Sequence, residues 1–263
     1  MLDDSVTGAT SEEVEEEMEK LVCAVQVGNV AALEEWLAKG NDASFIYHGQ
    51  SLLQIVVRVY ANSCHGHDFI NFLHCGLMAA LSLLLRHDAD VNRADSYGMT
   101  PLYRIASPDR FPRQITDVAR LLLDAGAAVD ARTNSGCTPL INASLHNNCD
   151  MIRILMSRGA SPLVRAGGRD AEAWVRFHRE EHGRSRELAA AAYLLADVRA
   201  AGGWKAYVRA PRVRLLVLRH FCAEGKAAPP MGDDLLQRLF SRHFPKEIFY
   251  LIFRYWRTPR DDP

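Results

Sequence analysis

The chain has no long hydrophobic run. No apolar stretch among its 263 residues approaches the ~18 residues that a membrane-spanning helix requires, and the start MLDDSVTG lacks the basic and apolar regions of a secretory signal peptide. Six cysteines are present without a Cys-x-x-Cys pair, which argues against disulfides. We therefore expect a protein with reduced thiols and no membrane partner that stays in the cytoplasm, with the nucleus as the alternative.

Motifs that carry catalysis are also missing. The sequence contains no phosphate-binding P-loop, no dinucleotide glycine fingerprint, no nucleophile elbow and no His-Glu-x-x-His. Cys23 and Cys149 fall within helical patterns, where a small buried thiol is the usual explanation. We expect neither enzymatic activity nor a cofactor.

Net charge of one sign is nearly absent, since the formal value is −1. The charges are nevertheless uneven: residues 1–20 hold eight acidic residues against one lysine, whereas residues 165–220 carry a basic excess. A basic region of this kind can bind RNA, but no aromatic-rich binding motif accompanies it. We interpret it as solvated surface and expect no nucleic-acid partner.

One short motif occurs twice, as YGMTPL at 97–102 and SGCTPL at 135–140. In each copy the glycine suits a turn with positive φ, the threonine can cap a helix, the proline suits the first helical position, and the leucine begins an apolar face. These residues are Gly98, Thr100, Pro101 and Leu102, then Gly136, Thr138, Pro139 and Leu140. The motif predicts a turn followed by a helix.

The second copy is followed by INASLHNNCDMIRILMSRGAS, which predicts two short helices separated at Asn147-Asn148. The second of these helices has an apolar stripe and ends at Gly159. Gly126 and Gly159 close two successive units 33 residues apart, a period typical of repeats built from a turn and two helices.

This pattern resembles the ankyrin-repeat family, whose consensus runs Asp-x-x-Gly-x-Thr-Pro-Leu-His. The first copy keeps Asp95, whereas the second has Thr133 at that place, and Tyr103 and Ile141 replace the family histidine. We expect these replacements to weaken two hydrogen bonds of the pattern. The resemblance implies an all-α ankyrin solenoid of helix-turn-helix repeats with hairpin loops, which binds a partner protein.

Further repeats surround the two motif copies. The first repeat breaks at Gly28-Asn29 and ends at Gly40, and the next pairs GQSLLQIVVRVY (49–60) with a helix at 76–92. A short insertion, SPDRFPRQ, explains the wide spacing of the two motif copies. The predicted organisation is an acidic N-terminal segment at 1–16, about four ankyrin repeats at 17–166 with an insertion near 61–75, a degenerate fifth repeat or helical cap at 167–203, and a C-terminal helical region at 204–263.

The apolar stripes of the repeats predict one continuous core, because a single repeat cannot bury its own stripe. The expected core residues are Leu81, Leu84, Leu85, Leu121, Leu122, Ile154 and Leu155.

The insertion gathers the potential metal ligands Cys64, His65, His67, His74 and Cys75. Zinc could be held by four of them, but Cys64 beside His65 and His74 beside Cys75 give a spacing unlike that of zinc families. The alternative is a loop that runs into a helix whose Phe69, Phe72 and Leu73 pack on the repeats. We expect no bound metal.

The family resemblance implies that a partner protein contacts the hairpin tips and the inner helices, which line a concave face. Carried over by position, the candidate partner-binding residues are Tyr47, His48, Gln50, Ser96, Tyr97, Met99, Asn134, Ser135, Cys137 and His146. Tyr97 and Tyr47 are the strongest candidates, since tyrosine adds a large contact area at low entropic cost.

The C-terminal stretch FPKEIFYLIFRYW, residues 244–256, resembles the first helix of an F-box and is similar to the truncated F-box, or PRANC domain, of poxvirus ankyrin proteins. The matching residues are Phe244, Pro245, Glu247, Ile248, Ile252, Phe253 and Trp256. A weaker resemblance links Leu218, Phe221 and Cys222 to the suppressor-of-cytokine-signalling box. Either resemblance implies a substrate adaptor that recruits a cullin-type ubiquitin ligase.

The alternative is that the C-terminal helices cap the open end of the solenoid. The sequence thus predicts a non-catalytic scaffold that binds a protein partner, with a ubiquitin-ligase adaptor as the alternative hypothesis.

Overall fold

The computed structural model describes residues 11–62, 70–107, 112–182 and 189–210. The chain divides into two compact units, Met1–Ala192 and Tyr193–Pro263. Among the described helices, none is both long and apolar enough to cross a membrane.

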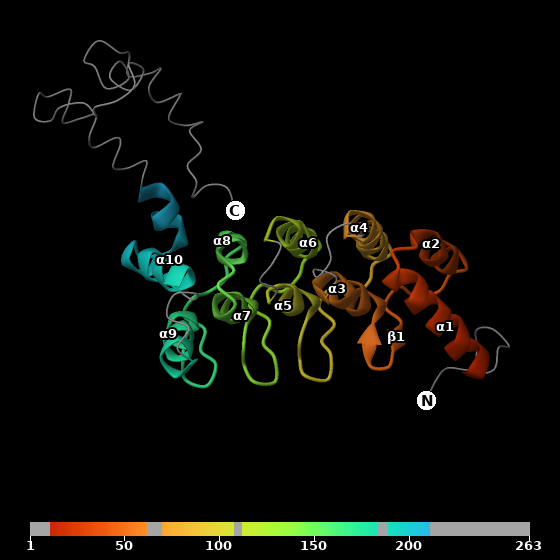
Figure 1. Cartoon of the computed structure of the whole chain (residues 1–263), viewed down its shortest axis with the longest axis horizontal. Coiled ribbons are helices and arrows are strands. Elements are labelled where there is room, and N and C mark those ends of the chain that lie inside the picture. The colour runs from red at the N-terminus through yellow and green to blue at the C-terminus, as the bar shows by residue number, and fades with distance from the viewer. Residues whose placement is uncertain (1–10, 63–69, 108–111, 183–188, 211–263) are drawn as a thin grey trace, which may run out of the picture. The chain divides into compact units, whose positions relative to one another are not determined.

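The first unit is a row of helix pairs (Figure 1). The first helices α1, α3, α5, α7 and α9 form one row, the second helices α2, α4, α6 and α8 form another, and hairpin loops project beyond the first row. The elements are α1 (Ser11–Gln26), α2 (Val30–Ala38), β1 (Ile46–Tyr47), β2 (Gln50–Ser51), α3 (Leu52–Asn62), α4 (Ile70–Arg86), α5 (Pro101–Ile105), α6 (Pro112–Asp124), α7 (Pro139–Leu145), α8 (Cys149–Ser157) and α9 (Ala171–His182). This architecture confirms the predicted all-α solenoid.

The two motif copies begin α5 and α7 as predicted. The Thr100 hydroxyl accepts a hydrogen bond from the Tyr103 N–H at 3.3 Å, and the Thr138 hydroxyl accepts one from the Ile141 N–H at 3.4 Å. A proline occupies the first turn of each helix, where its missing N–H leaves no partner unsatisfied. Each helix is therefore started by its own local sequence.

The repeat that matches the motif loosely uses a different cap. The Gln54 N–H donates to the Ser51 hydroxyl at 3.2 Å, and the Ser51 N–H donates to the Gln54 side-chain oxygen at 2.9 Å. This reciprocal pair is a capping box, which satisfies two helix N–H groups at once. Strands β1 and β2 pair antiparallel just before it, with Tyr47 opposite Gln50.

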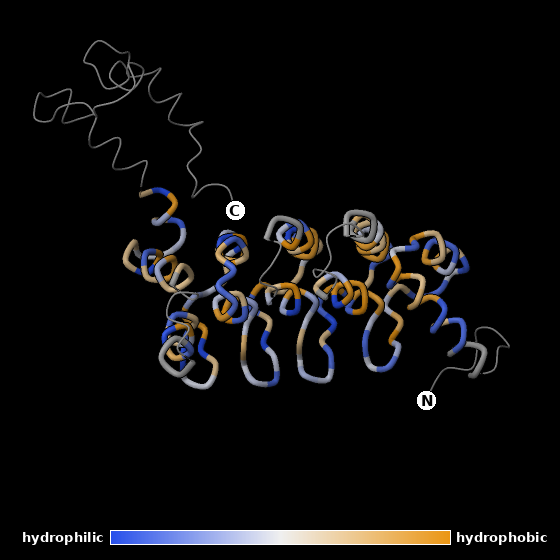
Figure 2. The backbone as a smooth tube through the Cα atoms, viewed as in Figure 1, coloured by the Kyte–Doolittle hydropathy of each residue, from blue (hydrophilic) through white to orange (hydrophobic). Residues whose placement is uncertain are grey.

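The core lies between the two rows of helices. Figure 2 shows hydrophobic residues in the helices of both rows, while the hairpin loops carry hydrophilic residues among more apolar ones. Most of the predicted core residues are fully buried: Leu81, Leu84, Leu122, Ile154 and Leu155. Leu85 and Leu121 are only half-buried, contrary to the prediction. Successive helix residues point about 100° apart, and the adjacent Leu84 and Leu122 take the core-facing positions.

The cysteine prediction is wrong for Cys23, which is exposed. Leu21, Val22 and Val25 take the core-facing positions of α1. Cys149 is half-buried, and that burial raises the pKa of its thiol above the ordinary value.

The predicted insertion near 61–75 is partly helical, because α4 begins at Ile70 rather than near 76. Cys64, His65, His67 and Phe69 lie outside the described residues, as do the side chains of Phe72, Leu73 and His74, whereas Cys75 is exposed.

Helix α10 (Ala189–Ala200) begins in the first unit and ends in the second. The division between the units thus falls inside the predicted segment 167–203. In the second unit the backbone is helical again at 204–210, and the Trp204 and Tyr207 rings lie 5.6 Å apart between centroids. Residues 211–263 are outside the described part, and with them the F-box-like residues at 244–256 and the alternative segment at 218–222.

Candidate partner-binding surface

The hairpin before α5 is held by the Asp95 carboxylate. One carboxylate oxygen accepts hydrogen bonds from the Tyr97 and Met99 N–H groups, each at 2.9 Å, and the other pairs with the Arg104 guanidinium group. Burial pushes the pKa of Asp95 up, but the bonds from Met99, Arg104 and Tyr97 together hold it below the ordinary value. The tip residues Ser96 and Tyr97 are exposed, and 67% of the Tyr97 surface is accessible to solvent. The loop that carries Tyr97 is held in place by these bonds.

The hairpin before α7 uses Thr133 in place of the aspartate. Its hydroxyl accepts a hydrogen bond from the Cys137 N–H at 3.1 Å and lies 2.9 Å from the Ser135 hydroxyl. The Asp95 carboxylate accepts hydrogen bonds from two loop N–H groups, whereas the Thr133 hydroxyl accepts a hydrogen bond from one. The loop therefore keeps its shape without a charge.

The tips of the hairpins before α5 and α7 are bonded to each other. The Asn134 backbone N–H donates to the Tyr97 carbonyl at 3.0 Å, and the Asn134 side-chain amide donates to the Ser96 carbonyl at 2.9 Å. The predicted contact residues Ser96, Tyr97 and Asn134 are thus brought together. The Asn134 side-chain amide is already engaged in a hydrogen bond within the chain.

The other predicted residues occupy different places. The Tyr47 and His48 rings meet edge to face, 4.2 Å apart between centroids, at the tip of the β1–β2 hairpin, beside Gln50. Ser135 is exposed, while Met99 and Cys137 are half-buried at the bases of their loops. His146 is exposed but follows the last residue of α7, at the opposite end of that helix from the hairpins.

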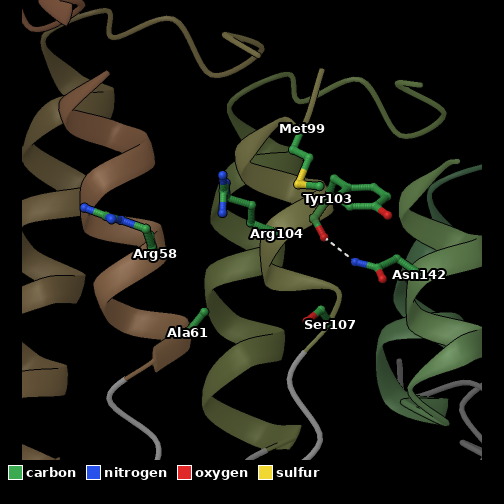
Figure 3. A pocket seen from close by; sticks show the side chains of 7 residues that line it. All are labelled: Arg58, Ala61, Met99, Tyr103, Arg104, Ser107 and Asn142. Atoms are coloured by element: carbon green, nitrogen blue, oxygen red, sulfur yellow. Dashed lines mark hydrogen bonds between the residues drawn. The ribbon is translucent and has the colours of Figure 1, made fainter. Parts of the chain in front are cut away.

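A pocket of about 270 Å³ opens beside these hairpins and crosses the first helices α3, α5 and α7 (Figure 3). Arg58 lies at its α3 end and Asn142 at its α7 end, with Tyr103 and Arg104 of α5 between them. Met99, which the sequence placed at a hairpin, also lines it.

Polar bonds between helices and loops keep these first helices in register. The Asn142 amide donates to the Tyr103 carbonyl at 2.9 Å, and the Gln54 amide donates to the Arg93 carbonyl at 2.6 Å. Gln54 stands where the consensus has histidine. The Ser-x-x-Gln capping pattern is the sequence signal from which its position could have been found.

The potential metal ligands are not gathered in the described part of the chain, where no three His, Cys, Asp or Glu side chains converge. Apart from Cys75, the side chains of the 64–75 cluster lie outside that part, so the prediction for this cluster stays a prediction.

The stacked helix pairs and bonded hairpins define the described chain as an all-α ankyrin-repeat solenoid. Residues 73–166 match the family model for ankyrin repeats in three copies.

The chain is similar to human BCL-6 corepressor-like protein 1, with 34% identity over 84 residues, which cover 32% of this chain and 4% of that protein. The mouse protein of the same name is 35% identical over 84 residues, with coverage of 32% and 4%. A putative E3 ubiquitin-protein ligase, XBAT34 of Arabidopsis thaliana, is 37% identical over 84 residues, which cover 30% of this chain and 21% of that protein. The chain thus spans a small part of these curated relatives. The repeats themselves imply a role in protein–protein interaction.

Proposed function

We propose that the chain is a non-catalytic scaffold that binds a partner protein through its hairpin face, defined as the tips at 46–50, 95–99 and 133–137 with the adjoining sides of α3, α5 and α7. The observation that carries this proposal is the bonded pair of tips before α5 and α7, in which Asn134 holds the backbone of Ser96 and Tyr97. A preorganised surface loses little conformational entropy on binding.

Tyr97 is the central contact of the proposed interface. Its side chain is large and exposed, and its loop is held by Asp95. Binding of a partner would therefore immobilise few additional rotatable bonds. Tyr47 is half-buried against His48 and offers a second aromatic contact on the same row.

The test is affinity capture from cells with quantitative mass spectrometry. Tyr97→Ala is compared with Val27→Ala, which also removes an exposed apolar side chain but from the α1–α2 turn, away from the hairpins. We expect proteins captured by the native chain to be lost with Tyr97→Ala and kept with Val27→Ala, when both variants fold by circular dichroism. Equal loss with both variants, or with neither, would refute the hairpin face as the interface.

We propose a ubiquitin-ligase adaptor as the second candidate function. It is favoured by the F-box-like pattern at 244–256 and by the similarity of the repeats to a putative ubiquitin ligase. The residues that would recruit the ligase are Pro245, Glu247, Ile248, Ile252, Phe253 and Trp256.

The same capture experiment tests this candidate with a chain that carries Ile248→Asp and Ile252→Asp. Cullin and F-box adaptor subunits should be captured by the native chain and lost from the folded variant. If ligase subunits appear with neither chain, or if the variant unfolds, the predicted C-terminal helices have a structural role and the scaffold function stands alone.

A further inference from the structure

The pocket across α3, α5 and α7 holds more hydrogen-bond donors than acceptors. Arg58 and Arg104 each carry five N–H donors and no acceptor. The Nε atoms of both are buried without a hydrogen-bond partner. The Asn142 amide at the far end already donates to the Tyr103 carbonyl. Acceptors are therefore scarcer than donors in the pocket.

The charges in the pocket are also unbalanced. Arg104 is neutralised by Asp95, whose side chain is only 3% exposed. The Arg58 Nε has no hydrogen-bond partner, and no acidic residue of the described ranges forms an ion pair with Arg58. Among the described residues, the positive charge of Arg58 is thus without an acidic partner. Partly buried charges are stabilised by an opposite charge with hydrogen-bonding oxygens.

The shape of the pocket sets the size of its ligand. Its volume of about 270 Å³ is enough for one or two side chains, and lies below the range of ~300–1,000 Å³ typical of small-molecule sites. It crosses α5 from Arg58 at one end to Asn142 at the other, with the ring of Tyr103 and the thioether of Met99 between them (Figure 3). An extended peptide can follow that path.

We propose that this pocket binds an anionic side chain, a carboxylate or a phosphorylated residue, in an extended segment of the partner protein. The anionic group lies at the arginine end and the neighbouring side chain packs on Tyr103 and Met99. This inference rests on the proposed scaffold function and names the chemistry of its partner.

The test starts with a phage-displayed library of random dodecapeptides selected against the full chain. The same selection is run against Arg58→Met, which keeps the apolar stem and removes the guanidinium group. Arg132→Met is the matched control, because Arg132 is an exposed arginine outside the pocket. We expect enrichment of Asp and Glu with the native chain and Arg132→Met, and loss of that enrichment with Arg58→Met.

Titration of one enriched peptide by fluorescence anisotropy gives the magnitude. Replacement of its acidic residue by glutamine should weaken binding to the native chain roughly tenfold, as loss of a charge-assisted hydrogen bond does, and should change binding to Arg58→Met little. A peptide with phosphoserine at the same position is compared with the peptide that carries glutamate there. The peptide that binds more tightly identifies whether a phosphorylated residue or a carboxylate is the native anionic group. Should Arg58→Met fold poorly by circular dichroism, Arg58→Gln replaces it.

Three results would overturn the inference. Enriched peptides without acidic residues, bound equally by Arg58→Met, would leave the scaffold function intact but remove the anion site. No enrichment with any chain would count against both proposals. Arg58-dependent binding of labelled poly(U) RNA without acidic peptides would assign the pocket to nucleic acid instead.

Discussion

The side-chain amide of Asn134 donates a hydrogen bond to the carbonyl oxygen of Ser96, which lies 38 residues earlier at the tip of the preceding hairpin. The same asparagine packs closely on Gly98, where an added Cβ would lie 2.6 Å from its side-chain oxygen and 2.7 Å from its backbone nitrogen. The two hairpins are therefore in contact through both a hydrogen bond and a glycine.

Gly98→Ala should destabilise the protein more than Gly40→Ala. Both glycines have positive φ, at +75° and +84°, so both substitutions carry a backbone penalty of roughly 1–2 kcal/mol. A Cβ on Gly40 meets nothing within 4 Å, whereas one on Gly98 collides with Asn134 and adds ~1–3 kcal/mol. Urea denaturation of the two variants measures the difference. Equal losses would show that the hairpins are not in close contact.

Gly76→Ala should destabilise the protein although alanine favours helix formation by up to ~1 kcal/mol. A Cβ on Gly76, in α4, would lie 2.3 Å from the Gly28 carbonyl oxygen and 2.8 Å from the Gly28 Cα in the α1–α2 turn. We expect a net loss of about 1–3 kcal/mol by urea denaturation. Cys75→Ala, at the exposed preceding residue, is the control and should change stability by less than ~0.5 kcal/mol. A stabilised Gly76→Ala would contradict this packing.

Asp95→Asn should lower stability at pH 7 by ~1–3 kcal/mol and by progressively less as the pH falls. Because the folded pKa of Asp95 lies below its ordinary value of 3.8, its charge stabilises the fold above the unfolded pKa. That contribution is lost as the pH falls through the folded pKa. Urea titrations at pH 7, 4, 3 and 2 measure the convergence of the two proteins.

Thr133→Val is the matched control for this titration. It removes the corresponding acceptor of the next hairpin, which has no charge to titrate. Its cost of about 1 kcal/mol should be the same at every pH. An Asp95→Asn difference that is equally constant would rule out a role for the Asp95 charge.

Leu122→Ala and Tyr97→Ala should separate stability from binding. Leu122 is fully buried, and its truncation should cost ~2–5 kcal/mol and lower the midpoint of thermal unfolding by circular dichroism. Tyr97→Ala should leave that midpoint nearly unchanged, because its side chain is mostly exposed. If Tyr97→Ala unfolded the protein as readily, Tyr97 would not be a tip residue.

The helix starts could be predicted because capping is local. Thr100 and Tyr103, or Thr138 and Ile141, are three residues apart in the sequence and bond across one turn. Cys23 was misplaced because a helical pattern alone does not say which stripe of a helix faces its neighbours.

The pocket could not be found in the sequence. Arg58 and Arg104 belong to different repeats, and no spacing rule relates two residues whose proximity depends on the stacking of α3 on α5. The hairpin tips were predicted as candidates from the family pattern, but the bond between Asn134 and Ser96 again depends on how successive repeats align. The motif determines the helix caps within one repeat, whereas contacts between repeats depend on how the repeats stack.

Asn92 links one repeat to the next with both ends of its amide. It donates to the Gly126 carbonyl at 3.1 Å and accepts from the Ala128 N–H at 2.7 Å. Because neighbouring repeats are bonded in this way, unfolding of one repeat destabilises the repeats beside it. The repeats at the ends of such an array, which have one neighbour instead of two, therefore unfold first. The amide hydrogens of α5 and α7 should then exchange with solvent more slowly than those of α1, and the hairpin that carries Tyr97 lies in the most persistent part of the array.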